Sequence, residues 1–100
     1  MVSRIIYSAY AKQNLREIFE YISNDSKLYA SRQILKIKFK IKFLKNNPKI
    51  GRIVPEMGIE HIREIIEGNY RIIYMLISEY QLDILTIHHT SRKLNITHFL

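Results

Sequence analysis

The stretch ILKIKFKIKFLK, from Ile34 to Lys45, decides the fold, because its pattern fits a strand as well as a helix. Apolar residues and lysines alternate almost without a break from Lys36 to Phe43, and a period of two is typical of an amphipathic strand. On a helix the same residues form two apolar stripes separated by lysines, one with Ile34, Ile37, Ile41 and Leu44 and the other with Leu35, Phe39 and Phe43. We predict the helix, because residues 27–46 contain no Gly or Pro, are too numerous for one strand and follow a capping sequence. One stripe can then pack on a sheet and the other on a neighbouring helix or a partner.

The residues before this segment predict a strand and a first helix. The segment RIIY, Arg4 to Tyr7, is short and β-branched, and Ser8 after it is a typical helix N-cap. Apolar residues then follow at the helical spacing i, i+3, i+4 and i+7, namely Leu15, Ile18, Phe19 and Ile22. We expect a helix from about Ala9 to Ser23, and then a turn in the segment SNDS that caps the second helix.

After Lys45 the pattern changes to one long loop and three strands. The loop from Asn46 to Gly58 contains both prolines and two of the three glycines. Runs rich in β-branched and aromatic residues follow at 60–67, 70–77 and 82–89, and Gly68-Asn69 between the first two is typical of a tight hairpin. We therefore predict an α+β fold with an N-terminal strand, an antiparallel helical hairpin and a three-stranded antiparallel meander, with the helices on one face of the sheet.

Length and composition limit the chain to a single domain over residues 1–100. With 47% hydrophobic and 25% charged residues, the composition is that of a compact globular protein rather than a disordered one. The absence of cysteine excludes disulfides and thiolate zinc sites, and the sequence contains no motif for a metal or a cofactor, so we expect neither. No apolar window suits a signal peptide or a membrane span, so we expect a cytoplasmic protein without a membrane partner.

The formal net charge of +7 is unevenly distributed. Nine basic residues and no acidic ones occur from position 27 to position 52, namely Lys27, Arg32, Lys36, Lys38, Lys40, Lys42, Lys45, Lys49 and Arg52. Such a block attracts a polyanion, either nucleic acid or an acidic protein segment. The alternative is a solvated lysine face that serves only solubility.

Arg71 is unusual because it lies inside a mostly apolar strand. A two-residue turn at Gly68-Asn69 places Arg71 opposite Ile66. A guanidinium keeps its charge, so it needs a partner or open solvent. Arg71 either pairs with Glu64 or Glu67 on the sheet, or points from an uncovered sheet face toward a phosphate, whose oxygen pairs fit its planar fork.

The last strand runs into a polar cluster, ILTIHHTSRK, that can present an edge to an anionic target. His88 and His89 point to opposite faces, so at most one of them lies beside Arg71. A second turn of two or four residues pairs Arg71 with His88, and a turn of three residues pairs it with His89. The like charge of the arginine disfavours imidazolium, so the adjacent histidine could act as a general base.

The order of these elements and motifs resembles the RelE/ParE superfamily of toxins from type II toxin-antitoxin modules, and its ParE branch most. The likeness covers about residues 3–93 and includes the helical hairpin. The matching positions are Leu15, Ile18, Tyr21 and Ile22, then Ala30, Leu44 and Pro48, then GRIVPE (Gly51 to Glu56), IRE (Ile62 to Glu64), YRIIY (Tyr70 to Tyr74) and IHHTSR (Ile87 to Arg92).

This resemblance implies a bacterial growth inhibitor that a cognate antitoxin, a small acidic protein, holds inactive. The C-terminal segment of such an antitoxin wraps over the hairpin and the sheet of the toxin. An amphipathic acidic segment that folds on binding would suit the second apolar stripe and the lysines beside it. We expect the antitoxin to contact Leu35, Lys36, Phe39, Lys40 and Phe43.

The branch implies the target. ParE-like toxins inhibit DNA gyrase and trap its cleaved DNA complex as binders rather than as enzymes, and the residues expected to contact the target are Arg52, Glu56, Arg71, Tyr74 and Arg92. RelE-like toxins are endoribonucleases that cleave mRNA on the ribosome, and the catalytic residues would then be Arg63, Arg71, His89 and Arg92. The GRIVPE motif and the long second helix favour gyrase over the ribosome and mRNA.

Overall fold

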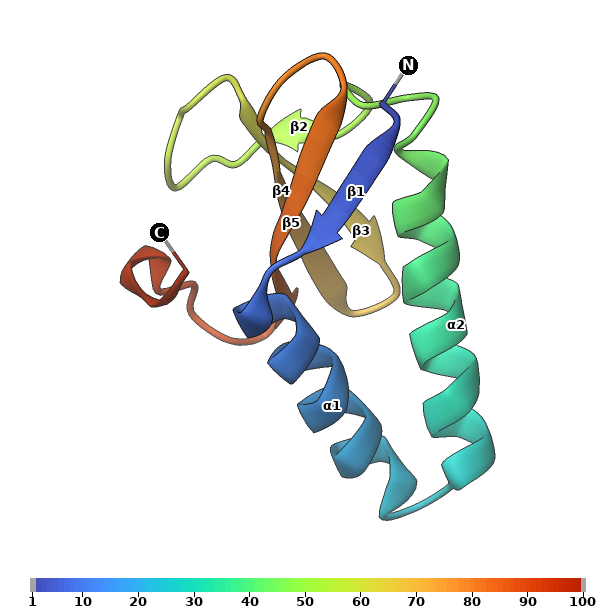
Figure 1. Ribbon diagram of the computed structural model, residues 1–100. Coiled ribbons are helices and arrows are strands. Elements are labelled where there is room, and N and C mark those ends of the chain that lie inside the picture. Colours follow the sequence, from blue (N-terminus) through green and yellow to red (C-terminus); the bar gives the residue numbers. More distant parts are fainter. Residues whose placement is uncertain (1, 100) are drawn as a thin grey trace.

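The computed structural model describes residues 2–99 and shows two antiparallel helices packed on one face of a five-stranded sheet (Figure 1). The strand order across the sheet is β1-β5-β4-β3-β2. The elements are β1 (Arg4–Tyr7), α1 (Ala9–Ser23), α2 (Lys27–Phe43), β2 (Arg52–Ile53), β3 (Ile62–Glu67), β4 (Tyr70–Leu76), β5 (Gln81–His89) and a short 3-10 helix, η1 (Ile96–His98). The predicted α+β fold is confirmed, and neither described helix is long and apolar enough to cross a membrane.

The ambiguous stretch is helical, and both of its predicted stripes are present. The side chain of Ser26 accepts a hydrogen bond from the backbone N–H of Tyr29 and so caps α2, as Ser8 caps α1. The inner stripe packs on the sheet, with Ile37, Ile41 and Leu44 buried and Ile34 half-buried. The outer stripe faces solvent, with Leu35, Phe39 and Phe43 exposed by 66%, 76% and 50%.

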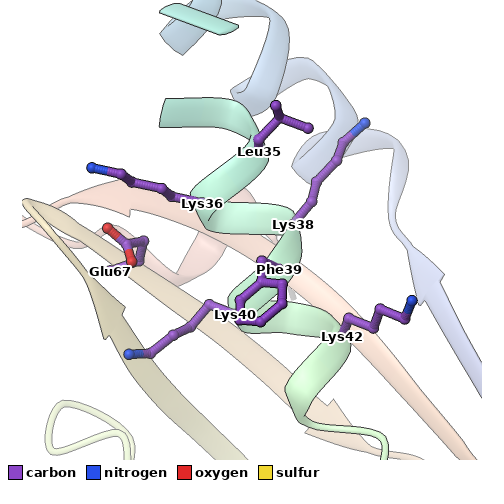
Figure 2. Close-up of a pocket in the computed structure, with 7 residues that line it drawn as sticks. All are labelled: Leu35, Lys36, Lys38, Phe39, Lys40, Lys42 and Glu67. Carbon is purple, nitrogen blue, oxygen red and sulfur yellow. The ribbon is translucent and has the colours of Figure 1, made fainter. Parts of the chain in front are cut away.

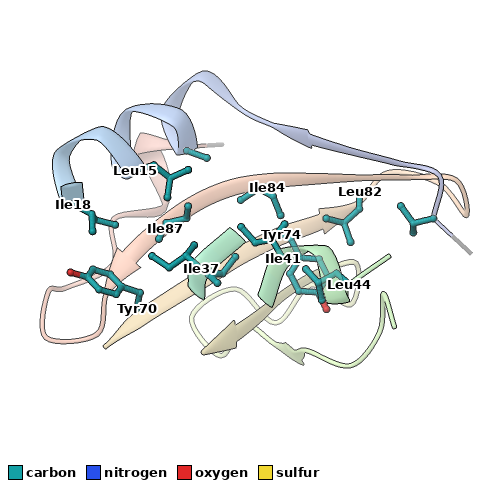
Figure 3. Packing of buried hydrophobic residues seen from close by; sticks show 13 residues of the cluster. Leu15, Ile18, Ile37, Ile41, Leu44, Tyr70, Tyr74, Leu82, Ile84 and Ile87 are labelled. Carbon is teal, nitrogen blue, oxygen red and sulfur yellow. The ribbon is translucent and has the colours of Figure 1, made fainter. Parts of the chain in front are cut away.

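The main core lies between the helices and the sheet (Figure 3). α1 contributes Leu15 and Ile18, and β4 and β5 contribute alternate residues that point toward the helices, namely Tyr70, Ile72, Tyr74, Leu82, Ile84 and Ile87. Full burial stabilises the fold by about 1.5–3 kcal/mol for each large aliphatic side chain. Burial of these side chains therefore holds both helices against the sheet.

The sheet contains three features that the sequence pattern did not predict. β1 pairs with β5 in the parallel direction, and the two-residue β2 extends the meander at its other edge. β5 also contains a bulge, because Ile73 pairs with Thr86 whereas the next residue, Tyr74, pairs with Ile84. Leu85 is the extra residue, and the bulge shifts the register of everything that follows it.

The face of the sheet opposite the helices is covered, so the alternative in which Arg71 points from an uncovered sheet face is wrong. Ile62, Ile73 and Leu85 form a second, smaller core on this face. The loop after β2 covers it with Val54, Met57 and Ile59, and the C-terminal segment covers it with Leu94 and Phe99. Side chains of this second face, including Arg71, therefore lie beneath loops rather than in open solvent.

Candidate functional site

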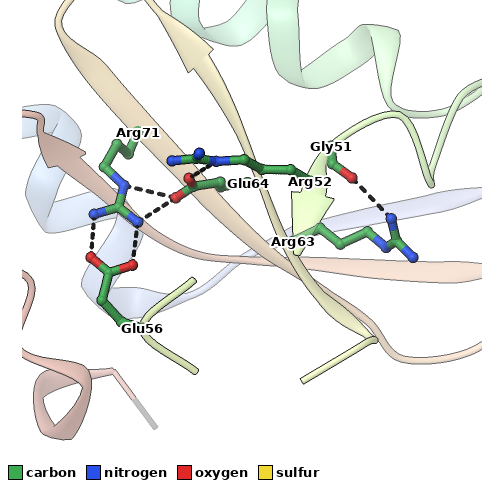
Figure 4. Close-up of polar contacts among 6 residues, drawn as sticks. All are labelled: Gly51, Arg52, Glu56, Arg63, Glu64 and Arg71. Carbon is green, nitrogen blue, oxygen red and sulfur yellow. Dashed lines mark hydrogen bonds and ion pairs between the residues drawn. The ribbon is translucent and has the colours of Figure 1, made fainter. Parts of the chain in front are cut away.

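Arg71 is held by two carboxylates on the second face of the sheet (Figure 4). Its two terminal nitrogens donate to both carboxylate oxygens of Glu56 at 2.7 and 2.8 Å, and its Nε donates to Glu64 at 2.7 Å. Glu64 is fully buried and also accepts from Arg52, which reaches across from β2. We call these four residues, Arg52, Glu56, Glu64 and Arg71, the arginine cluster.

Within the arginine cluster, carboxylates of the same chain balance the positive charge of Arg71. The hydrogen bonds from Arg71 lower the pKa of Glu56 from its ordinary value of 4.5 to about 2. The same hydrogen bonds raise the pKa of Arg71, so both groups are charged at any physiological pH. The Arg71 side chain is only 12% exposed, and each of its nitrogens has a carboxylate partner. The expectation that its guanidinium lies free for a phosphate is therefore wrong, and the pairing with Glu64 is confirmed.

Tyr74 lies on the helix side of β4 and is fully buried, so its predicted place on a target-binding surface is wrong. Its hydroxyl donates to the carbonyl of Pro48 at 2.8 Å and accepts from the N–H of Gly51 at 3.0 Å. A Cβ at position 51 would lie 2.6 Å from this hydroxyl and from the Glu64 carbonyl oxygen, so only glycine fits there. The Gly-Arg pair of GRIVPE thus fixes the loop that leads into β2.

Arg63, a predicted ribonuclease residue, also binds backbone. It lies opposite Tyr74 in the pairing of β3 with β4. Its guanidinium donates to the carbonyl oxygens of Gly51 at 3.0 Å and Glu60 at 3.1 Å, and its side chain is mostly buried (Figure 4). These bonds join the loop before β2 to β3, which is a structural role.

The predicted ribonuclease residues do not converge on one point. Because of the bulge in β5, Arg71 pairs with His88, while His89 pairs with Tyr70 on the opposite face. The His89 ring meets the Tyr70 ring edge-on at 5.3 Å, and its Nδ1 accepts from the N–H of Ser91. Arg92 is exposed in the turn after β5. Arg71 and His89, the two central members of the predicted catalytic set, therefore lie on different sides of the sheet.

The outer surface of α2 is the second basic region, and Figure 2 shows its lysines with Glu67 near Lys36 and Lys40. An open groove of about 660 Å³ runs along the helix and is lined by Leu35, Lys36, Lys38, Phe39, Lys40, Lys42 and Glu67. Within residues 2–99 none of these lysines forms an ion pair. We call Leu35, Phe39 and Phe43 with the lysines at 36, 38, 40 and 42 the α2 surface.

The α2 surface is longer than the sequence pattern suggested. Leu28 and Tyr29, at the start of α2, are both largely exposed. Leu28 lies seven residues before Leu35, which places it on the same side of the helix, and this spacing could have extended the predicted stripe. In the part of the chain that the structure describes, no group of three or more His, Cys, Asp or Glu side chains is placed to hold a metal ion.

One family model matches most of the chain. Residues 5–94 match the model of the ParE toxin of the type II toxin-antitoxin system parDE. No protein with a curated function matches the sequence significantly.

Three solved structures share the fold. A structure of the chromosomal ParDE toxin-antitoxin system from P. aeruginosa has a TM-score of 0.72 at 17% identity, covering 91% of this chain and 98% of that one. A mutant of the E. coli toxin RelE in the free state has a TM-score of 0.67 at 15% identity, covering 91% and 86%. The toxin-antitoxin complex RelBE2 from Mycobacterium tuberculosis has a TM-score of 0.60 at 19% identity, covering 89% and 99%.

Proposed function

Because the chain belongs to the ParE toxin family of type II toxin-antitoxin systems, we propose that it inhibits growth by poisoning DNA gyrase and that a cognate antitoxin neutralises it. The observation that carries this proposal is the family match over residues 5–94, nearly the whole domain. Inhibition of gyrase is the activity that the likeness to ParE toxins implies.

Two features of the site support a toxin that binds its target over one that cuts RNA. Arg71, which a ribonuclease would place on phosphate, is occupied by Glu56 and Glu64. His89, the predicted acid or base, lies on the opposite face of the sheet. A general base must lie within hydrogen-bond reach of the reacting group, and the residues of the predicted set do not share such a point.

The α2 surface has the chemistry that an acidic amphipathic segment requires. Its exposed leucine and phenylalanines supply an apolar stripe, and burial of each against a partner removes apolar area from water. The lysines on both sides of the stripe form no ion pair within residues 2–99, where Glu67 is the one carboxylate that lines their groove, so a partner can supply further counter-charges. A helical segment of the antitoxin laid along α2 would satisfy both requirements. Two of the similar structures are described as toxin-antitoxin systems or complexes.

A supercoiling assay tests the proposed target. Purified toxin is added to DNA gyrase with relaxed plasmid, and both the supercoiled product and the cleaved DNA are measured. A gyrase poison reduces supercoiling and increases the cleaved DNA, and addition of the antitoxin reverses both effects. The same toxin must first be shown to inhibit growth when it is expressed in cells. Normal supercoiling at a large excess of this toxin would then contradict the proposal.

A ribosome-dependent endoribonuclease is the second candidate, because the fold is also that of the E. coli toxin RelE. His89 and Arg92 of the predicted catalytic set do line one cleft at the end of β5. Primer extension on cellular mRNA after induction of the toxin tests this candidate. Cleavage at a fixed position within codons would favour the ribosome, and intact transcripts during growth arrest would eliminate it.

A further inference from the structure

Two kinds of side chain run in parallel rows along the outside of α2. The outer stripe, Leu35, Phe39 and Phe43, continues at Leu28 toward the start of the helix, and all four side chains are at least half exposed. Leu28 and Phe43 are 15 residues apart, which is roughly 22 Å along a helix axis. α2 runs along one side of the molecule, from the hairpin turn to the loop before β2, so this apolar row lies on the outside of the domain (Figure 1).

Lysines flank the apolar row on both sides. Figure 2 shows Lys36 and Lys40 extending to one side of the helix and Lys38 and Lys42 to the other, with Phe39 between them. α2 itself contains no acidic residue. The four methylene groups of a lysine can lie along an apolar surface while the ammonium group stays in a polar environment. The cations can therefore contact one layer of a partner while the apolar row contacts another.

This arrangement is typical of a helix that lies at the surface of a lipid bilayer. The apolar side of such a helix enters the boundary between the headgroups and the acyl chains, and its lysines reach back to the lipid phosphates. Electrostatic attraction to anionic lipids adds to the burial of apolar area. Both contributions are available on the α2 surface, and the net charge of +7 attracts the whole chain to an anionic layer.

Apart from the proposed antitoxin segment, other macromolecules fit the α2 surface less completely. A second copy of the chain would bring the same lysines against these lysines, and like charges repel. A nucleic-acid duplex would pair the lysines with phosphates but would leave the phenylalanines against a hydrated backbone. An anionic bilayer supplies phosphates and an apolar layer at adjacent depths, so it satisfies both rows at once.

We propose that in the free chain the α2 surface binds the surface of an anionic lipid bilayer. α2 would lie in the plane of the bilayer, with Phe39 and Phe43 at the acyl-chain boundary and the lysine ammonium groups on the lipid phosphates. Among the residues that line the groove, Glu67 is the one carboxylate that opposes this contact. The expectation of no membrane partner concerns spanning segments, and a contact with the bilayer surface requires none. The site goes beyond the proposed function, because neither inhibition of gyrase nor binding of the antitoxin requires lipid.

Co-sedimentation of the purified chain with lipid vesicles tests the proposal. The vesicles contain phosphatidylglycerol and phosphatidylcholine in equal amounts, and vesicles of phosphatidylcholine alone are the neutral comparison. Binding should be at least about tenfold tighter to the anionic vesicles and should weaken as salt is added. A short DNA duplex, measured by fluorescence anisotropy, tests nucleic acid as the alternative partner.

Two double variants of equal net charge separate the α2 surface from general charge attraction. Lys36→Gln with Lys40→Gln removes two cations beside the apolar row, so binding to the anionic vesicles should weaken about 25-fold, or about fivefold for each lysine. Lys12→Gln with Lys93→Gln removes two exposed cations that do not line the groove, and binding should weaken by less than about threefold. A difference between the two variants therefore reports on the position of the charges.

Tryptophan fluorescence tests whether the apolar row enters the bilayer. The sequence contains no tryptophan, so a single introduced indole is the source of this signal. Emission from Phe39→Trp should move to shorter wavelength when anionic vesicles are added, because the ring leaves water. Tyr80→Trp is the matched control, since Tyr80 is exposed in the β4–β5 turn, and its emission should stay unchanged.

Several outcomes would overturn the proposal. They are equal binding to neutral and anionic vesicles, equal effects of the two double variants, and unchanged emission from vesicle-bound Phe39→Trp. Binding of the DNA duplex without binding of vesicles would assign the α2 surface to nucleic acid instead. Because the assays contain no gyrase and measure no growth, their failure would leave the proposed gyrase activity untouched.

Discussion

The arginine cluster and the α2 surface are both rich in cations, yet they differ in where their counter-charges lie. In the arginine cluster Glu56 and Glu64 supply the counter-charges from within the chain, and Arg71 is almost enclosed. On the α2 surface the lysines face solvent without a carboxylate partner in the described residues. The sequence makes the arginines conspicuous, but the lysines are the charges that remain free for a partner.

The difference shows how a charged residue should be judged before its function is assigned. A cation inside a β-meander has acidic neighbours on adjacent strands and on the loops that cover them, so local pairing can satisfy it. The block from position 27 to position 52 has nine cations and no acid, so its own residues supply no counter-charge. The free charge of this domain is therefore concentrated on α2.

Removal of Glu64 should give the largest effect on stability. Glu64→Ala leaves Arg52 without its carboxylate and leaves the nearly buried Arg71 with only Glu56. Breaking one side of a buried ion pair costs about 3 kcal/mol, which a urea titration of the free energy of unfolding would measure. Glu60→Ala, which removes an exposed carboxylate on Arg63, should cost less than about 1 kcal/mol. Equal costs would mean that the cluster is not structural.

Truncation of the α2 surface should reduce antitoxin binding and leave stability unchanged. Phe39→Ala removes the most exposed ring of the stripe, so we expect a loss of about 2 kcal/mol in binding, roughly 30-fold. The free energy of unfolding should change by less than about 0.5 kcal/mol. Isothermal titration calorimetry with the C-terminal segment of the antitoxin would measure the affinity. Tyr80→Ala, at an exposed ring in the β4–β5 turn, is the control, and an equal loss there would contradict the assigned surface.

Loss of the Tyr74 hydroxyl tests whether this residue is structural rather than a target contact. Tyr74→Phe leaves the N–H of Gly51 and the carbonyl of Pro48 without this partner. An unsatisfied buried polar group costs about 1–3 kcal/mol, and we expect about 1.5 kcal/mol by thermal unfolding. Below the melting temperature, inhibition by the folded variant should be unchanged. A variant of normal stability that no longer inhibits would reverse our assignment.

Acid should weaken the arginine cluster by a small amount. The pKa of Glu56 falls from 4.5 to about 2 on folding, so its contribution is fully present above pH 4.5 and is lost as the pH falls through about 2. Because the Glu56 side chain is 42% exposed, solvent screening limits this contribution to about 1 kcal/mol. The difference in stability between the wild type and Glu56→Gln should therefore shrink between pH 4.5 and pH 2. A constant difference would exclude the ion pair as its cause.

Local signals in the sequence predicted most of the fold. Ser8 and Ser26 marked the starts of both helices, and Gly68-Asn69 fixed the pairing of Arg71 with Ile66. The two-sided helix was predicted because the apolar positions of α2 form two stripes rather than one. These features depend on neighbours within a few residues along the chain.

The missed features depend on distant residues. The bulge at Leu85 shifts the register by one residue, and nothing in a strand of alternating apolar residues marks its position. Of the two carboxylate partners of Arg71, Glu64 was predicted, whereas Glu56 was missed because it is 15 residues away in a loop whose path the sequence does not reveal. The second core likewise joins Val54 to Phe99, which are brought together only by the completed sheet. Site residues were therefore harder to predict than the elements that hold them.

Amide hydrogen exchange of the chain, alone and with the antitoxin segment, tests most directly whether α2 rather than the arginine cluster forms the partner surface. Our assignment of the partner surface to α2 predicts slower exchange across residues 28–43 on binding, and unchanged exchange in β2, β3 and β4. Slower exchange confined to residues 52–71, with α2 unchanged, would contradict it.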